Sequence, residues 1–273
     1  MELLRALAVL CEPPAAEHRR IGGLLRLPGE PRPDDYAEVF LFQLYPYASV
    51  YLGAEGKLGG EARDRVAGFW RALELVPPPE PDHLAALLGL YAGLAEAEAP
   101  AQWRRALLWE HLLSWTPPYL AKLEEVAPPF YRGWARLLRE ALAAEAAALG
   151  PLPSQPLAHR DAPPLQPPSA VGGAAFLEQL LAPLRTGVVL VRDDLVAAAR
   201  ELGLGLRVAE RRYVLEALLA QDARATLDWL AAQARRWAAR HEPGFWSGRA
   251  AAAAILLAEA ARGAAEQEVV HAR

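Results

Sequence analysis

The sequence predicts an all-α protein, a helical bundle with an additional helical C-terminal region. Two observations support this fold class. Apolar residues make up 53% of the 273 positions, and in most segments they recur every three or four residues, the spacing of one helix face. The sequence contains no series of alternating segments of the kind that forms a sheet. Apolar helix faces can be buried only against one another, so the helices are expected to form a bundle.

Five helices are expected in the first half of the chain: 34–45, 61–76, 82–98, 103–115 and 128–149. Acidic residues open the first helix, and Pro77 to Pro79 end the second. Asp82 is a plausible N-cap for the third. Pro117 and Pro118 are expected to close the fourth, because proline interrupts a helix. The fifth repeats large apolar side chains over three turns.

A proline-rich segment divides the chain. Seven of the 18 residues in 151–168 are proline, so we expect a linker or an ordered arm with neither helix nor sheet. It separates a domain of residues 1–150 from a helical extension, 169–273, whose role the sequence leaves open. The helices expected there are 174–184, a segment capped by Asp193 and Asp194 that ends at Gly203, 208–220, 223–241 and 246–268. The sequence TGVVLV at 186–191 is expected to be a brief strand or an extended connection.

Charge and cysteine content exclude several classes of function. The net charge of −4 does not favour nucleic acid as the main partner, which would select a basic face. Cys11 is the single cysteine, so one chain can form neither a disulfide framework nor a thiolate zinc site. No apolar run approaches the roughly 18 residues that span a bilayer, and no membrane insertion is expected. The N-terminal residues lack the basic start of an export signal, so we expect a cytoplasmic protein.

No motif points to catalysis, a cofactor or a metal. A Walker loop and a GxSxG elbow are absent, and WEHLLSW at 109–115 lacks the HExxH spacing that puts two imidazoles on one helix face. We therefore expect no enzyme, no cofactor and no metal site. An enzyme using His83, Asp82 and Glu110 as acid–base groups stays an alternative, provided that these groups converge in a pocket.

A DNA-binding regulator is the alternative from another class. Residues 194–219 read as two helices joined by a glycine-containing turn, the outline of a helix-turn-helix. Arg207, Arg211 and Arg212 could contact phosphates there. However, 169–273 carries 13 basic and 12 acidic residues, and any antiparallel helix pair has the same outline, which favours a structural interpretation.

The first half carries five signals in a fixed order. They are Tyr36-x-x-x-Phe40, YPYASVYL at 45–52, PDHLAALLGLYAGL at 81–94, EHLLSWTPPYL at 110–120 and APPFYRGWARLL at 127–138. In this order they resemble the TorD/DmsD/NarJ family of redox-enzyme maturation chaperones, which includes proteins like the nitrate reductase delta subunit. The resemblance covers roughly residues 1–145.

The resemblance implies a TorD-like helical chaperone. Such a protein binds the apo catalytic subunit of a molybdenum-dependent oxidoreductase, or its twin-arginine signal peptide, and assists cofactor insertion and assembly. The peptide-binding residues that the resemblance implies are Pro46, Tyr47, Ser49, Tyr51, Glu80, Pro81, Asp82, His83, Glu110, His111, Trp115 and Tyr119. Ala48 departs from the acidic residue or glycine that relatives often carry, and 169–273 has no evident counterpart in the family.

The same residues suit a physical account of peptide binding. A signal peptide presents arginines followed by an apolar stretch, so its receptor needs an aromatic groove with carboxylates near one end. Tyr47, Tyr51 and Tyr119 would supply the aromatic surface, and Asp82, Glu80 and Glu110 the carboxylates. We therefore expect aromatic side chains from three separate stretches to converge in one apolar channel with negative charge at its mouth.

Other interpretations of these residues remain open. Asp82 can be an ordinary helix cap, His83 can simply be exposed, and Trp115 and Trp134 lie on helical stripes and can be core. The sequence leaves the client enzyme, its export and any nucleotide binding undecided. It also leaves open the oligomeric state, with a homodimer among the options.

Overall fold

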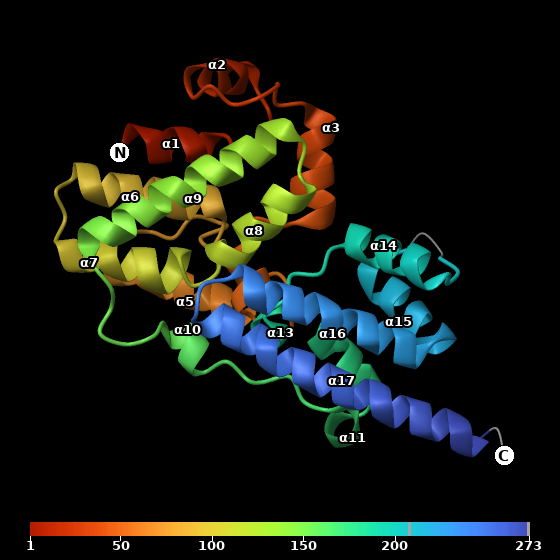
Figure 1. The fold of residues 1–273 in the computed structure, drawn as a ribbon. Coiled ribbons are helices and arrows are strands. Elements are labelled where there is room, and N and C mark those ends of the chain that lie inside the picture. Colours follow the sequence, from red (N-terminus) through yellow and green to blue (C-terminus); the bar gives the residue numbers. More distant parts are fainter. Residues whose placement is uncertain (207–208, 272–273) are drawn as a thin grey trace. The chain divides into compact units, whose positions relative to one another are not determined.

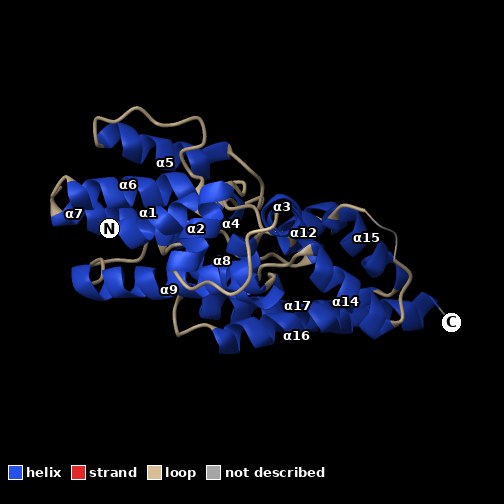
Figure 2. Ribbon diagram, turned by 90° about the horizontal axis from the view of Figure 1, so that it is seen from above, coloured by secondary structure: helices blue, strands red, loops and turns tan. Residues whose placement is uncertain are grey.

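The computed structural model describes residues 1–206 and 209–271, with side chains described as far as residue 265. Every named element in this part of the chain is a helix (Figures 1 and 2). The all-α fold class predicted from the sequence is confirmed. None of the described helices is long and apolar enough to cross a membrane.

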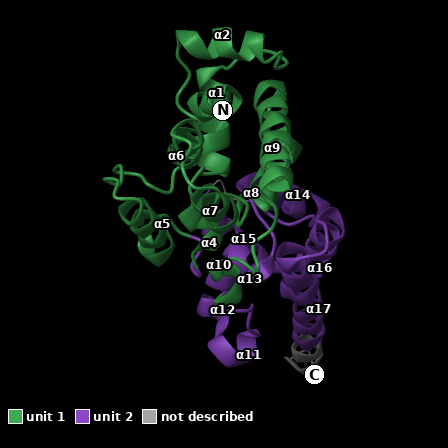
Figure 3. Cartoon of the chain, turned by 90° about the vertical axis from the view of Figure 1, so that its left-hand side faces the viewer, with its two compact units in different colours: residues 1–53, 57–161 green, residues 54–56, 162–273 purple. Residues whose placement is uncertain are grey.

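The chain divides into two compact units (Figure 3). Unit 1 comprises residues 1–53 and 57–161, and unit 2 comprises 54–56 and 162–273. The change from unit 1 to unit 2 at residues 161 and 162 falls inside the proline-rich segment 151–168. The short segment 54–56 belongs to unit 2 although it lies within the first half of the sequence.

Unit 1 is a bundle of helices. Its elements are α1 (Glu2–Val9), α2 (Ala16–Leu24), α3 (Pro33–Tyr36), the π-helix η1 (Ala37–Gln43), α4 (Ala48–Leu52), α5 (Gly60–Ala72), α6 (Leu84–Glu96), α7 (Ala101–Ala106), the π-helix η2 (Leu107–Leu112), α8 (Thr116–Val126), α9 (Pro129–Leu149) and α10 (Leu157–Arg160). α1 packs against α6 and α9, and α8 packs against α9. These contacts bury the apolar stripes that the sequence predicts.

An aromatic cluster lies in the core of unit 1. The Phe40 ring meets the rings of Tyr131 and Trp134 edge to face, with centroids 5.0 and 5.7 Å apart. Tyr36 lies 5.2 Å from Phe40, and the indole N–H of Trp134 donates to the Leu7 carbonyl at 2.9 Å. The Tyr36-x-x-x-Phe40 motif therefore serves packing, since both rings are buried.

Two expectations about proline in unit 1 are wrong. Pro117 and Pro118 do not close a helix: the preceding helix ends at Leu112, and the two prolines lie in the first turn of α8. Proline fits there because the first N–H groups of a helix have no intrahelical acceptor. In the segment expected to hold no helix, four residues form α10 directly after Pro156, which uses the same tolerance for proline at a helix start.

Unit 2 is also helical. Its elements are α11 (Pro168–Val171), α12 (Gly173–Leu180), α13 (Pro183–Thr186), α14 (Arg192–Leu202), α15 (Arg211–Gln221), α16 (Ala223–Arg240) and α17 (Phe245–His271). α16 and α17 pack against each other along their length and bury three tryptophans, Trp229, Trp237 and Trp246. Thr186 ends α13, and residues 188–191 are buried and lie in neither helix nor strand, so a connection and not a brief strand is observed there.

Two arginines form hydrogen bonds that link the segment 54–56 to the rest of unit 2. Arg185 donates to the carbonyls of Ala54 at 2.8 Å and Pro164 at 3.1 Å. Arg211 donates to the carbonyls of Leu190 at 3.0 Å and Gly56 at 3.5 Å. Burial lowers the pKa of Arg185. Both guanidiniums thus link the backbones of segments that are distant in sequence.

These contacts bear on the helix-turn-helix alternative. Arg211, one of the arginines suggested for phosphate, is engaged by backbone carbonyls. Arg212 lies 3.9 Å from the Glu178 carboxylate, and Arg207 lies outside the described residues. The geometry therefore favours the structural interpretation of 194–219.

Candidate functional site

Two loops of unit 1 meet where the sequence places most of the candidate residues. We call the contact between residues 45–49 and 80–84 the loop junction. The Leu84 N–H donates to the Pro46 carbonyl at 2.8 Å and the Ala48 N–H to the Asp82 carbonyl at 3.0 Å. Tyr47 and His83 form an isolated antiparallel bridge between these bonds. Backbone pairing therefore brings together Pro46, Tyr47, Pro81, Asp82 and His83.

Asp82 links the two loops through its side chain. Its carboxylate accepts the Ser49 N–H at 3.1 Å and is buried, with the residue 2% exposed. Ser49 lies in the first turn of α4, whose N–H groups lack intrahelical acceptors. Asp82 therefore caps α4 from another loop. Its predicted role as the N-cap of its own helix is wrong, because His83 occupies that position and its Nδ1 accepts the Ala85 N–H at 3.2 Å.

Replacing Asp82 by alanine is expected to lower the free energy of unfolding by about 1–3 kcal/mol, because a buried N–H loses its charged acceptor. Urea unfolding measures this loss. The matched control is Asp64→Ala, since the Asp64 side chain is 71% exposed and pairs with its chain neighbour Arg63. Its effect is expected within about 0.5 kcal/mol. Equal losses in the two variants would contradict the capping role.

Ser49 is also a structural residue of the junction. It is fully buried, its hydroxyl accepts the Gly59 N–H at 3.1 Å, and its carbonyl accepts the Gly53 N–H at 2.8 Å. Pro46 and Pro81 are buried as well. These residues hold the loops in place, whereas the surface that a partner can reach consists of their neighbours.

His83 forms the floor of that surface. It is 7% exposed, and its ring lies edge-on to the Tyr47 ring with centroids 4.8 Å apart. Its Nδ1 lies 3.6 Å from a Glu12 carboxylate oxygen. Burial lowers the pKa of His83, while Glu12, Glu80 and Asp82 oppose that shift. Three carboxylates therefore lie near the His83 ring.

The accessible part of the site is acidic. The Tyr47 hydroxyl donates to Glu80 Oε2 at 2.8 Å, and burial together with Glu80 raises the pKa of Tyr47. Glu80 is exposed, and the Glu12 side chain is 52% exposed. We call Glu12, Tyr47 and Glu80 the acidic rim. It offers two carboxylates to a cationic partner, and Glu12 is a member that the sequence reasoning missed.

Exposed apolar side chains shortly precede Tyr47 in the chain. Leu41, Phe42 and Tyr45 are 49%, 60% and 40% exposed, although large apolar groups usually lie inside. The sequence reasoning missed Leu41 and Phe42 as surface residues. The available signal was the run FLFQLYPY at 40–47, which is too apolar around the whole helix for a single buried face.

Tyr51, Trp115 and Tyr119 come together, but inside the core. Tyr51 stacks on Trp115 with centroids 5.2 Å apart, and Tyr119 lies 5.3 Å from Tyr51. All three are at most 1% exposed. These aromatics come from two of the three expected stretches, and they line no open channel, because their rings fill the space between one another. Tyr51 also reaches the junction, where its hydroxyl donates to the Tyr45 carbonyl at 3.1 Å.

Glu110 and His111 have structural partners of their own. The Glu110 carboxylate accepts the Leu157 N–H at 2.7 Å, at the start of α10. The His111 ring lies 4.7 Å from that of Phe69 and is buried. Glu110 therefore contacts a different segment from His83, and the geometry lends no support to an acid–base pair. Among the described residues no group of His, Cys, Asp and Glu could hold a metal ion.

The buried His111 predicts a pH-dependent stability. Burial, with Arg65 nearby, lowers its pKa to about 4, below the value near 6.5 in an unfolded chain. The unfolded state then binds the extra proton, so stability falls as pH drops from about 6.5 towards 4. The expected loss from this residue at pH 5 is about 2 kcal/mol.

Urea unfolding of the wild type and of His111→Gln, at pH 7.5 and pH 5, tests this expectation. The difference between the two pH values should be smaller in the variant by about 2 kcal/mol. Comparing the two pH differences cancels any pH-independent change in stability that the substitution itself causes. Parallel pH dependences in both proteins would contradict the assignment.

Comparison with known proteins gives one family match. Residues 33–121 match the family model described as nitrate reductase delta subunit. The matched range contains the loop junction and the residues Glu110, Trp115 and Tyr119. A comparison with curated proteins gives no match.

Proposed function

We propose a specific chaperone role for this protein, because residues 33–121 match the model of the nitrate reductase delta subunit family, a family of molybdoenzyme assembly chaperones. It binds the apo catalytic subunit of a molybdenum-dependent oxidoreductase or the twin-arginine signal peptide of that subunit. It acts in the cytoplasm, assists cofactor insertion and assembly, and catalyses no reaction itself.

The proposal rests on the acidic rim together with the exposed apolar side chains of Leu41, Phe42 and Tyr45, which shortly precede Tyr47 in the chain. Two carboxylates, Glu12 and Glu80, lie around the Tyr47–His83 pair. Arginine is bound best by carboxylates that accept its fork of N–H donors. The apolar stretch of the peptide would then lie on Phe42 and Tyr45, which are exposed in the free protein.

Most of the twelve predicted residues divide into two roles in this proposal. Tyr47 and Glu80 contact the peptide directly, and His83 forms the base of the site. Several others position these groups: Asp82 and Ser49 fix the loops, and the stack of Tyr51 on Trp115 supports the junction from inside. Glu110 and His111 contact other segments of unit 1. A peptide on such a partly open surface should bind with a dissociation constant near micromolar, since ordering it costs about 2–5 kcal/mol.

Titration of the full chain with a synthetic peptide tests the proposal. The peptide carries an arginine pair followed by an apolar stretch, and the controls are a lysine-pair version and a scrambled sequence. Saturable binding is expected for the arginine peptide, weaker binding for the lysine peptide, and little for the scrambled one. Failure of all three peptides and of an apo catalytic subunit to bind at tens of micromolar protein would refute the proposed function.

A further inference from the structure

The loop between α4 and α5 returns twice to Ser49. The Gly53 N–H donates to the Ser49 carbonyl at 2.8 Å, and the Gly59 N–H donates to the Ser49 hydroxyl at 3.1 Å. The Ser49 N–H itself donates to the Asp82 carboxylate at 3.1 Å. Ser49 therefore joins both ends of the loop 53–59 to the loop junction, and a movement of this loop reaches Asp82 through one residue.

The loop has little rigidity of its own. Four of the eight residues 53–60 are glycine, and glycine loses more conformational entropy on ordering than any other residue. The preceding helix α4 has five residues, too few for a helix to be stable without contacts from other parts of the protein. Contacts from outside the segment 48–60 must therefore fix the positions of α4 and of the loop.

The middle of the loop belongs to unit 2 and is held there by backbone contacts. Arg185 on α13 donates through Nε to the Ala54 carbonyl at 2.8 Å and through Nη1 to the Pro164 carbonyl at 3.1 Å. Gly56 is buried, and a Cβ at this position would lie 2.9 Å from the Leu181 carbonyl oxygen. The loop backbone therefore packs directly on the backbone that connects α12 and α13.

We propose that unit 2 positions the loop junction through segment 54–56, with Arg185 as a positioning residue. Arg185 fixes the Ala54 carbonyl, two positions after the last residue of α4. The loop that closes on Ser49 then keeps the Ser49 N–H in place for the Asp82 carboxylate. This gives the helical extension 169–273 a role in the candidate site. The consequence for peptide binding rests on the proposed function.

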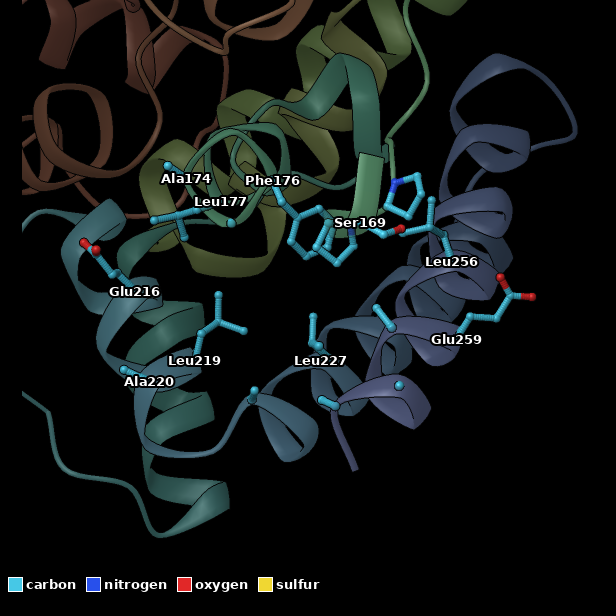
Figure 4. Close-up of a pocket in the computed structure, with 17 residues that line it drawn as sticks. Ser169, Ala174, Phe176, Leu177, Glu216, Leu219, Ala220, Leu227, Leu256 and Glu259 are labelled. Atoms are coloured by element: carbon cyan, nitrogen blue, oxygen red, sulfur yellow. The ribbon is translucent and has the colours of Figure 1, made fainter. Parts of the chain in front are cut away.

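Arg185 can be replaced without altering the open apolar groove of unit 2. This groove has a volume of about 850 Å³, and Figure 4 shows Phe176, Leu227 and Leu256 among the side chains that line it. Arg185 is not part of this lining. An effect of its replacement on the loop junction is therefore not a consequence of a changed groove.

Two substitutions in the full chain release segment 54–56 in different ways. Arg185→Ala removes both hydrogen bonds of the guanidinium, and Gly56→Ala places a Cβ against the Leu181 carbonyl oxygen and forces the loop away from it. Each should speed hydrogen exchange in residues 48–53. Each should also raise the dissociation constant of the arginine peptide about fivefold, because a smaller fraction of the molecules then holds the junction in its binding-competent form.

Each of these variants has a matched control. Arg249→Ala removes another half-buried arginine, whose hydrogen bond goes to the Ala162 carbonyl at 3.0 Å and not to segment 54–56. Gly60→Ala alters a glycine with φ +67°, close to the +63° of Gly56, but an added Cβ there meets nothing within 4 Å. Both controls should keep the exchange rates of residues 48–53 and the peptide affinity within about twofold of the wild type.

Unchanged exchange of residues 48–53 in Arg185→Ala and Gly56→Ala would overturn the proposal. Controls that speed this exchange as much as the two test variants would also overturn it, since the effect would then be a general loosening. Slow exchange in α16 and α17 confirms that unit 2 stays folded in each variant. If the wild type binds no peptide, the proposed function fails, whereas the exchange rates still decide whether unit 2 positions the junction.

Discussion

Replacing Gly187 by alanine is expected to lower the free energy of unfolding of unit 2 by about 4 kcal/mol or more. Gly187 has φ +70°, and an added Cβ would lie 2.4 Å from the Ala250 backbone nitrogen and 2.8 Å from the Trp246 carbonyl oxygen. Backbone atoms cannot turn away as a side chain can. The substitution therefore forces α17 away from α13, which loosens the core of unit 2.

Gly203→Ala is the matched control for this prediction. Gly203 has nearly the same conformation, φ +67°, but an added Cβ meets nothing within 4 Å. Its cost should be the conformational one alone, about 1 kcal/mol. Hydrogen exchange in α17 is the readout, with much faster exchange expected for Gly187→Ala. Equal exchange rates in the two variants would show that the close approach of backbone atoms to Gly187 does not make the alanine substitution destabilise α17.

Reversing the charge of the acidic rim is expected to weaken peptide binding by at least about tenfold, a loss of about 1.4 kcal/mol. The double variant carries Glu12→Lys and Glu80→Lys. It replaces two attractive contacts with the peptide arginines by repulsion, and it removes the acceptor of the Tyr47 hydroxyl. Isothermal titration calorimetry with the arginine peptide measures the change.

The control for the rim reversal is Glu61→Lys with Glu140→Lys, two exposed positions that change the net charge by the same amount. Its affinity should stay within about twofold of the wild type at physiological salt, because distant surface charges are screened. If the control loses as much affinity as the rim variant, net charge and not the rim governs binding. Unchanged affinity in the rim variant would place the peptide elsewhere.

Much of the fold could be predicted because the signals are local. The stripe of 128–149 places Phe130, Trp134 and Leu138 on one face, and the structure buries all three on α9. Proline is ambiguous, since it fits the start of a helix as well as it ends one. Pro117 and Pro118 show this ambiguity, since they start α8 where the sequence alone predicts the end of a helix.

The site was harder to predict because its geometry depends on contacts between distant residues. Asp82 has the sequence context of a helix cap, yet its carboxylate binds Ser49, 33 positions away. Tyr51 and Trp115 have the character expected of a peptide-binding wall, yet packing buries them. Periodicity shows which residues share a helix face and does not show which faces a partner can reach. Glu12 illustrates this limit, since only the structure brings it to His83.

Hydrogen exchange of unit 1 with and without the arginine peptide tests the central claim most directly, because it locates the bound peptide on the chain. The account predicts that slowed exchange is concentrated in residues 41–49 and 80–85, around the loop junction and the acidic rim. Saturating peptide that leaves these segments unchanged and protects another surface would contradict it.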